Sequence, residues 1–112
     1  MTGHIVILST CASEQEAEKL ALLLLDRRLA ACINVIPRVR SYYHWKGVVE
    51  SADEWMLLIK SSRALFAAVA KTIEEAHSYE VPEVVALPFV DGSVNYLAWL
   101  DANLRIHTRD DS

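Results

Sequence analysis

The stretch CINVIPRVRSYYHWKGVVESADEWMLLIK, residues 32–60, decides the fold because it reads as two long strands joined by a tight turn. β-Branched and aromatic residues recur over residues 31–45, and Pro37 marks a bulge or a sheet edge within them. Lys46 and Gly47 predict the turn, and residues 48–60 return as the second arm. Each arm exceeds the usual strand length of about 5–6 residues. The sequence therefore predicts a hairpin with unusually long arms.

A strand and a helix precede this hairpin. Residues 4–10 predict a strand that is central in its sheet, because residues 5–8 form the continuous apolar run of a strand buried on both faces. Ser13 and Glu16 then have the spacing of a capping box, and apolar residues follow with the period of a helix. We expect that helix over residues 14–28.

A second helix follows the hairpin. Ser61 or Ser62 predicts its N-cap, and its apolar stripe ends near His77. Residues 78–82 read as a loop, which leads into a fourth strand over residues 83–90. The second helix therefore connects the hairpin to that strand.

The last part of the chain predicts a sheet edge and a third helix. Pro88, near the end of the fourth strand, favours an edge or a bulge. Ser93 is a suitable N-cap for the third helix, and we expect residues 105–112 to fray.

The predicted order is β-α-β-β-α-β with an extra C-terminal helix. This is the ferredoxin-like arrangement, an α/β (α+β) fold with an antiparallel four-stranded sheet and two helices on one face. The other face and the spare length of the hairpin are then left for a partner or for water. We expect a single domain over residues 1–112, working as a small oligomer.

Composition narrows the possible partners. The chain is 53% hydrophobic and 23% charged, with a formal net charge of −4 and no long basic run. This balance disfavours nucleic acid as a partner. The longest apolar stretch, residues 20–25, is far short of a membrane span, and we find no signal-peptide pattern at the start. The sequence predicts no membrane association and a cytoplasmic location, where Cys11 and Cys32 are free thiols.

The motifs of common enzyme classes are missing from the sequence. It has no Walker or dinucleotide glycine pattern, no CxxC pair and only three glycines. No catalytic triad order is recognisable, and Glu80 and Glu83 have no evident reason to act as an acid–base pair. The four histidines also lack the close spacing of a metal motif. We therefore expect no enzymatic activity.

Two segments still carry candidate chemistry. Cys11, expected just past the first strand, is the more reactive thiol in prospect, whereas Cys32 reads as core filling. The segment HSYEVPE, residues 77–83, concentrates a histidine, a tyrosine and two carboxylates in one loop. It reads equally as a site and as a rigid connection in which Pro82 fixes the backbone and the carboxylates are solvated. For His77 alone, a hydrogen bond at a helix end is favoured over a role as ligand or pH-sensitive contact.

Several segments together resemble the CutA family of divalent-cation tolerance proteins. They are AACINVIPRVRSYYHWKGVVE (residues 30–50), LLIK (57–60), HSYEVPEVVALP (77–88) and NYLAWL (95–100). The resemblance covers nearly the whole chain. It implies a ferredoxin-like subunit in a tight homotrimer, similar in design to the PII signalling proteins. The hairpins then hold the subunits together, with Tyr43, Trp45 and Trp55 at the interface.

The resemblance also implies a role in tolerance of divalent cations, copper especially, with no obligatory cofactor. Copper-binding members have a cysteine where this chain has Ser9, and a histidine pair where it has Ala76 and His77. Cys11 lies two residues beyond Ser9 and can share its strand face. The implied metal ligands are therefore Cys11, His77 and Ser9, and a thiolate with an imidazole favours copper over magnesium or calcium.

Two functions remain open at this point. The first is a trimeric, non-enzymatic protein that binds divalent metal ions, copper among them, and contributes to metal tolerance. The alternative is a PII-like regulatory trimer that binds a small anionic metabolite at clefts between subunits. The residues expected to line such a cleft are Arg40, Lys60, Tyr79, Glu80 and Glu83.

Overall fold

The computed structural model describes residues 1–105, and its elements follow the predicted order. They are β1 (His4–Cys11), α1 (Glu14–Asp26), β2 (Cys32–Trp45), β3 (Val48–Ser62), the 3₁₀ turn η1 (Arg63–Leu65), α2 (Phe66–Ala76), β4 (Val85–Pro88) and α3 (Val94–Asn103). Of the segment predicted to fray, all but Arg105 lies outside the described residues.

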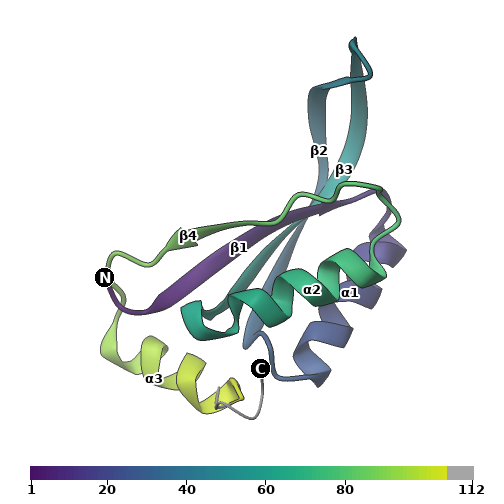
Figure 1. Cartoon of the computed structure of the whole chain (residues 1–112). Coiled ribbons are helices and arrows are strands. Elements are labelled where there is room, and N and C mark those ends of the chain that lie inside the picture. The colour runs from purple at the N-terminus through teal and green to yellow at the C-terminus, as the bar shows by residue number, and fades with distance from the viewer. Residues whose placement is uncertain (106–112) are drawn as a thin grey trace.

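The four strands form one antiparallel sheet in the order β2-β3-β1-β4. The central place of β1 and the edge position of Pro88 are therefore confirmed. Helices α1 and α2 lie on the same face of the sheet, and α3 lies near the N-terminal end of β1 (Figure 1). Fully buried side chains from both layers, among them Ile7, Leu24 and Ile73, form the core between them.

The β2–β3 hairpin is as long as the sequence predicts. Its arms have 14 and 15 residues, and its far end projects beyond the body of the sheet (Figure 1). The register shifts between Ile36 and Val39, so the bulge predicted at Pro37 is confirmed. Lys46 and Gly47 make the turn with φ angles of 52° and 81°. Two successive positive φ angles match the twist of a tight hairpin, which is why glycine suits the second position.

Three predicted boundaries were wrong. Helix α1 ends at Asp26 rather than Arg28, because Arg28 adopts a left-handed conformation with φ of 54°. Strand β4 is shorter than the predicted residues 83–90. Neither Ser61 nor Ser62 caps a helix with its side chain, because both pair with β1 as the last residues of β3. The predicted cap at Ser93 is confirmed, since its side chain accepts the Tyr96 N–H.

We predict that Ser61→Ala lowers the free energy of unfolding by about 1–3 kcal/mol. The buried Ser61 hydroxyl donates to the Leu29 carbonyl at 2.6 Å, and its loss leaves that carbonyl without this hydrogen bond. Urea unfolding of Ser61→Ala and of the neighbouring control Ser62→Ala measures the difference. Equal stability of the two variants would contradict this role.

Candidate functional site

Three potential metal ligands meet where β1 ends, α1 begins and α2 ends. Cys11 is the last residue of β1, Glu16 lies in the first turn of α1, and His77 caps the C-terminus of α2. One ligand atom of each lies within 4.8 Å of the others. Two of these residues, Cys11 and His77, are ligands that the sequence predicts. We call this group the Cys11–Glu16–His77 cluster.

The imidazole of His77 is fixed by two hydrogen bonds. Its Nε2 lies 2.6 Å from the Thr10 carbonyl, and its Nδ1 lies 3.0 Å from the Tyr79 amide nitrogen. Because the amide can only donate and the carbonyl can only accept, this network assigns the proton to Nε2. The lone pair of Nδ1 then accepts the Tyr79 N–H, and Glu16 Oε1 lies 3.8 Å from the same nitrogen. His77 thus makes the hydrogen bond at a helix end that the sequence allows, and it also belongs to the cluster.

Cys11 is not the exposed, reactive thiol that the sequence suggests. Strand β1 continues to this residue, so its side chain is fully buried. Burial, followed by the negative charge of Glu16, raises the pKa of the thiol to about 12. Cys32 is the more accessible of the two free cysteines, so the expectation that it is core filling was also wrong.

Glu16 is the member of the cluster that sequence reasoning missed. Burial alone would raise the pKa of its carboxyl group, but hydrogen bonds from Ser78 and from the Ala12 amide, with the nearby His77, hold it below its usual value. The signal was present in the capping-box spacing, since the Glu16 N–H donates to the Ser13 hydroxyl at 3.1 Å. A capping-box carboxylate reaches back past the helix start. Here that direction leads to the end of β1.

Ser9 occupies the same strand face as Cys11, because β1 runs through both residues. Its side chain is fully buried, and its hydroxyl has no hydrogen-bond partner among residues 1–105. Buried hydroxyl groups without a partner are uncommon. Ser9 is therefore a polar residue with an unused hydroxyl group, two positions before Cys11 in the sequence.

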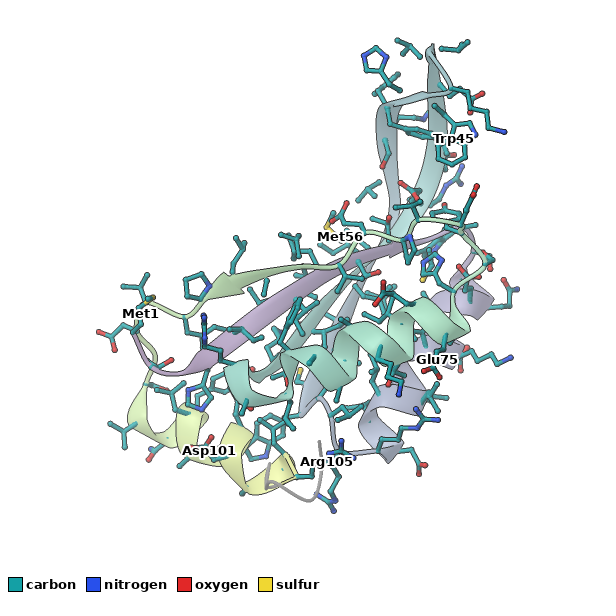
Figure 2. The ribbon with its side chains drawn as sticks, in the orientation of Figure 1. Met1, Trp45, Met56, Glu75, Asp101 and Arg105 are labelled. Atoms are coloured by element: carbon teal, nitrogen blue, oxygen red, sulfur yellow. The ribbon has the colours of Figure 1, made fainter. Side chains whose placement is uncertain are left out.

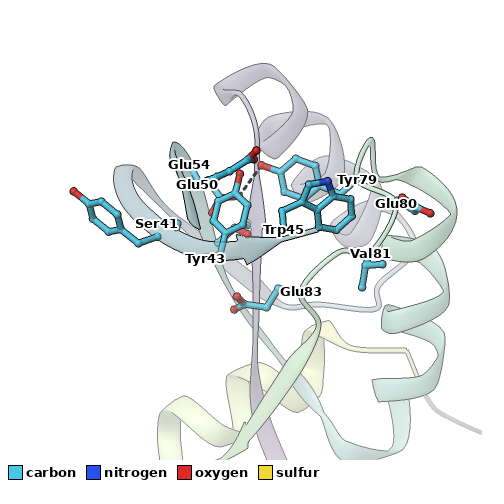
Figure 3. Close-up of a pocket in the computed structure, with 11 residues that line it drawn as sticks. Ser41, Tyr43, Trp45, Glu50, Glu54, Tyr79, Glu80, Val81 and Glu83 are labelled. Carbon is cyan, nitrogen blue, oxygen red and sulfur yellow. Dashed lines mark hydrogen bonds between the residues drawn. The ribbon is translucent and has the colours of Figure 1, made fainter. Parts of the chain in front are cut away.

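A cleft of about 580 Å³ lies between the hairpin and the segment that follows α2 (Figure 3). We call it the hairpin cleft. The predicted residues Tyr79, Glu80 and Glu83 line it, and so do Glu54 and further residues of the hairpin. The Tyr79 hydroxyl donates to Glu54 Oε2 at 2.6 Å. Burial and the Glu54 carboxylate raise the pKa of Tyr79, so it remains a neutral donor.

The predicted basic residues lie elsewhere. Neither Arg40 nor Lys60 lines the hairpin cleft. Arg40 Nε donates to Asp53 Oδ1 at 2.7 Å, and the Lys60 ammonium donates to the Asn34 side chain. Of the five residues expected from the sequence to line one cleft, Tyr79, Glu80 and Glu83 do so, and the two basic residues lie outside the cleft.

The aromatic residues expected at a subunit interface differ in their surroundings. Tyr43 and Trp45 are 40% and 39% exposed, and Trp45 lies on the projecting part of the hairpin (Figure 2). Trp55 is partly buried and packs against the intramolecular core. Of the three aromatic residues, Tyr43 and Trp45 are therefore the two whose side chains remain accessible on the surface of the chain.

Comparison with known proteins identifies relatives over almost the whole chain. The family model described as CutA1 divalent ion tolerance protein matches residues 5–103. The divalent-cation tolerance protein CutA of Thermus thermophilus is 41% identical over 98 residues, which cover 88% of this chain and 95% of that protein. A solved structure of the divalent cation tolerance protein from Thermus thermophilus superimposes with a TM-score of 0.89 at 39% identity, covering 91% of this chain and 99% of that one.

Other relatives are longer than this chain. The CutA homolog of Danio rerio is 36% identical over 97 residues, which are 87% of this chain but 65% of that protein. An Arabidopsis thaliana relative named as chloroplastic is 39% identical over 101 residues, which are 90% of this chain and 56% of that protein. This chain thus spans between half and two thirds of the length of these two relatives. In the part of this chain that the structure describes, no helix is both long and apolar enough to cross a bilayer.

We predict that Cys32 reacts with iodoacetamide before Cys11 in the native protein. With a pKa of about 12, Cys11 forms roughly a thousandfold less thiolate at neutral pH than an unfolded cysteine does. Peptide mapping after timed labelling measures both rates, and labelling in denaturant serves as the control. Native labelling of Cys11 at its unfolded rate would contradict the burial and the raised pKa.

Proposed function

Because the chain belongs to the CutA1 family of divalent ion tolerance proteins, we propose that it binds a divalent transition-metal ion at the Cys11–Glu16–His77 cluster. The convergence of the cluster carries this proposal: a thiol, a carboxylate and an imidazole from three separate elements lie within 4.8 Å of one another. Nitrogen and sulfur ligands with one carboxylate suit copper or zinc, whereas magnesium and calcium prefer oxygen ligands only. Copper is the ion we favour.

The spacing of the cluster fits one ion. Three ligand atoms at about 2.0–2.3 Å from one tetrahedral metal ion lie about 3.3–3.8 Å from one another, so the three side chains must move inward by on the order of 1 Å to hold it. The hydrogen bond from His77 Nε2 to the Thr10 carbonyl has the form of the outer-shell contact that orients metal-bound histidines. Ser9, on the same strand face as Cys11, is an additional candidate for contact with the thiolate.

Binding at this cluster carries two costs. The Cys11 thiol must lose a proton although its pKa is about 12, and Nδ1 of His77 must give up the hydrogen bond from the Tyr79 amide. Both costs lower the affinity for the ion, which makes its binding more readily reversible. Cys11 and the His77 side chain are also fully buried, so they are closed to a substrate molecule from solvent. These features support a non-enzymatic role in metal tolerance.

We further propose that the chain is a ferredoxin-like subunit of a homotrimer. Apolar and aromatic side chains remain exposed on the hairpin and on the edge strand β4. They include Ile36, Tyr43, Trp45, Val85 and Leu87. Extensive exposed apolar surface of this kind is typical of an interface. The proposed location is the cytoplasm, where Cys11 and Cys32 stay reduced.

We predict that anaerobic calorimetry with copper or zinc shows saturable binding to the wild type. Cys11→Ala and His77→Ala should weaken it by on the order of a hundredfold, since even outer-shell changes cost about tenfold or more. Glu16→Gln and Ser9→Ala should have smaller effects. The matched control is Cys32→Ala, which removes a thiol outside the cluster and should bind as the wild type does. Unchanged affinity in both of the first two variants would exclude this site.

Metal affinity should also fall as the pH falls. Below pH 12 the Cys11 thiol holds its proton in the metal-free protein and releases it on binding. Lower pH therefore opposes binding, by about tenfold per pH unit from this one proton. Titrations between about pH 8 and pH 6 measure the slope, and the slope should decrease in Cys11→Ser if weak binding remains. A pH-independent affinity would contradict thiolate ligation.

For the assembly, we predict a solution mass close to three times the chain mass of 12.6 kDa by light scattering. Trp45→Ala should destabilise the assembly by about 3–5 kcal/mol per subunit, by analogy with core truncations. Tyr42→Ala is the matched control, because Tyr42 is 71% exposed and alternation places it on the opposite hairpin face. A monomeric wild type at micromolar concentration would overturn the trimer.

A further inference from the structure

Tyr79 makes two hydrogen bonds that join the metal cluster to the hairpin. Its backbone N–H donates to His77 Nδ1 at 3.0 Å, and its hydroxyl donates to Glu54 Oε2 at 2.6 Å (Figure 3). Glu54 lies in β3 and is only 7% exposed. We call these two hydrogen bonds the Tyr79 link. One residue thus connects a candidate metal ligand with the longest strand of the fold.

His77 has only one nitrogen to offer to a metal ion. Its Nε2 carries the ring proton and donates it to the Thr10 carbonyl at 2.6 Å. Nδ1 has a single lone pair, which accepts the Tyr79 N–H. A bond from Nδ1 to an ion requires the same lone pair, so metal ligation and the amide hydrogen bond exclude each other. The Tyr79 amide therefore stands in the place that a cation would take.

The same segment also contacts Glu16. The Glu16 carboxylate accepts hydrogen bonds from the side chain and the backbone of Ser78, which lies between His77 and Tyr79 in the sequence. Residues 78 and 79 thus donate to two of the three potential metal ligands. Successive backbone N–H groups create positive potential of the kind that anions and lone pairs attract. This segment therefore supplies part of the potential that an ion would supply.

The distances leave no room for an ion while the amide stays in place. An ion such as zinc lies about 2.0–2.1 Å from an imidazole nitrogen, so along the lone pair it would be about 1 Å from the Tyr79 nitrogen. The amide must therefore move by on the order of 1 Å or more. A shift of that size takes the 2.6 Å contact with Glu54 beyond the usual O–H···O range of about 2.5–3.0 Å.

We propose that the Tyr79 link competes with a metal ion for the cluster, so that occupation of His77 Nδ1 releases Tyr79 from Glu54. This inference rests on the metal binding proposed above. Coupling between two such events is reciprocal: the link weakens binding of the ion by the same factor by which the ion weakens the link. Metal occupancy is thereby transmitted to the hairpin, through which we propose that the subunits associate.

The first test is Tyr79→Phe, which removes the hydroxyl of the link but none of the cluster ligands. Anaerobic calorimetry with zinc or copper(I) should show binding about threefold to tenfold tighter than in the wild type, because a hydrogen bond to a carboxylate no longer opposes release of the segment. Tyr96→Phe is the matched control. Tyr96 lies on α3, near the opposite end of β1 from Cys11 (Figure 1), and its variant should bind as the wild type does.

Hydrogen exchange of the Tyr79 amide, followed by NMR, is a readout that does not depend on affinity. The amide should be protected in the metal-free wild type, and saturation with zinc or copper(I) should remove the protection. Metal-free His77→Ala should lose it too, because the acceptor is gone, whereas metal-free Cys11→Ala should keep it.

The outcomes separate this inference from the proposed function. A wild type without saturable binding of either ion would exclude the metal site and the competition with it. Saturable binding that leaves the Tyr79 amide protected would exclude the competition alone, and so would equal affinity in Tyr79→Phe and the wild type.

Discussion

The hydrogen bond from the His77 imidazole to the Thr10 carbonyl determines where both candidate sites lie. The Phe89 amide donates to the His4 carbonyl, so alternation directs the even-numbered carbonyls of β1 toward β4. Strand β4 pairs with β1 only as far as Leu8. The Thr10 carbonyl therefore extends past the end of β4 without a strand partner. His77 donates to it at 2.6 Å, so the end of α2 supplies the hydrogen bond that β4 does not reach.

Two different environments follow on the two sides of this bond. On one side, the His77 imidazole lies near Cys11 and Glu16, which gives a closed group of three potential metal ligands. On the other side, the next residues of the chain carry Tyr79 to Glu54 and leave an open acidic cleft. The same strand end therefore borders two chemically different environments, a buried thiol with a high pKa and an acidic cleft with aromatic walls.

The sequence predicted the parts of this structure that depend on local backbone chemistry. Pro37 forced a bulge, the Lys46–Gly47 pair made the turn, and Ser93 capped a helix. The sequence failed where pairing across the sheet competed with a local signal. Ser61 has the chemistry of a helix cap, but pairing with Ile5 holds it in β3. Cys11 looked exposed for the same reason, because the pairing of β1 with β3 along its whole length cannot be read from its neighbours in sequence.

The environments of the two adjacent carboxylates in β3 were hard to predict because each depends on which face of the strand the residue occupies. Asp53 and Glu54 are adjacent carboxylates, but alternation sends them to opposite faces of β3. Asp53 meets Arg40 and Arg38, whose hydrogen bonds lower its pKa. Glu54 meets Tyr79, a residue 25 positions away in the segment that the His77–Thr10 hydrogen bond anchors to β1. If β2 shifted by one residue against β3, Arg38 and Arg40 would move to the face of Glu54. Asp53 would then lose its ion pairs, and Glu54 would gain them. The pairing register of β2 and β3 therefore determines which of the two adjacent carboxylates pairs with the arginines and which accepts the Tyr79 hydroxyl.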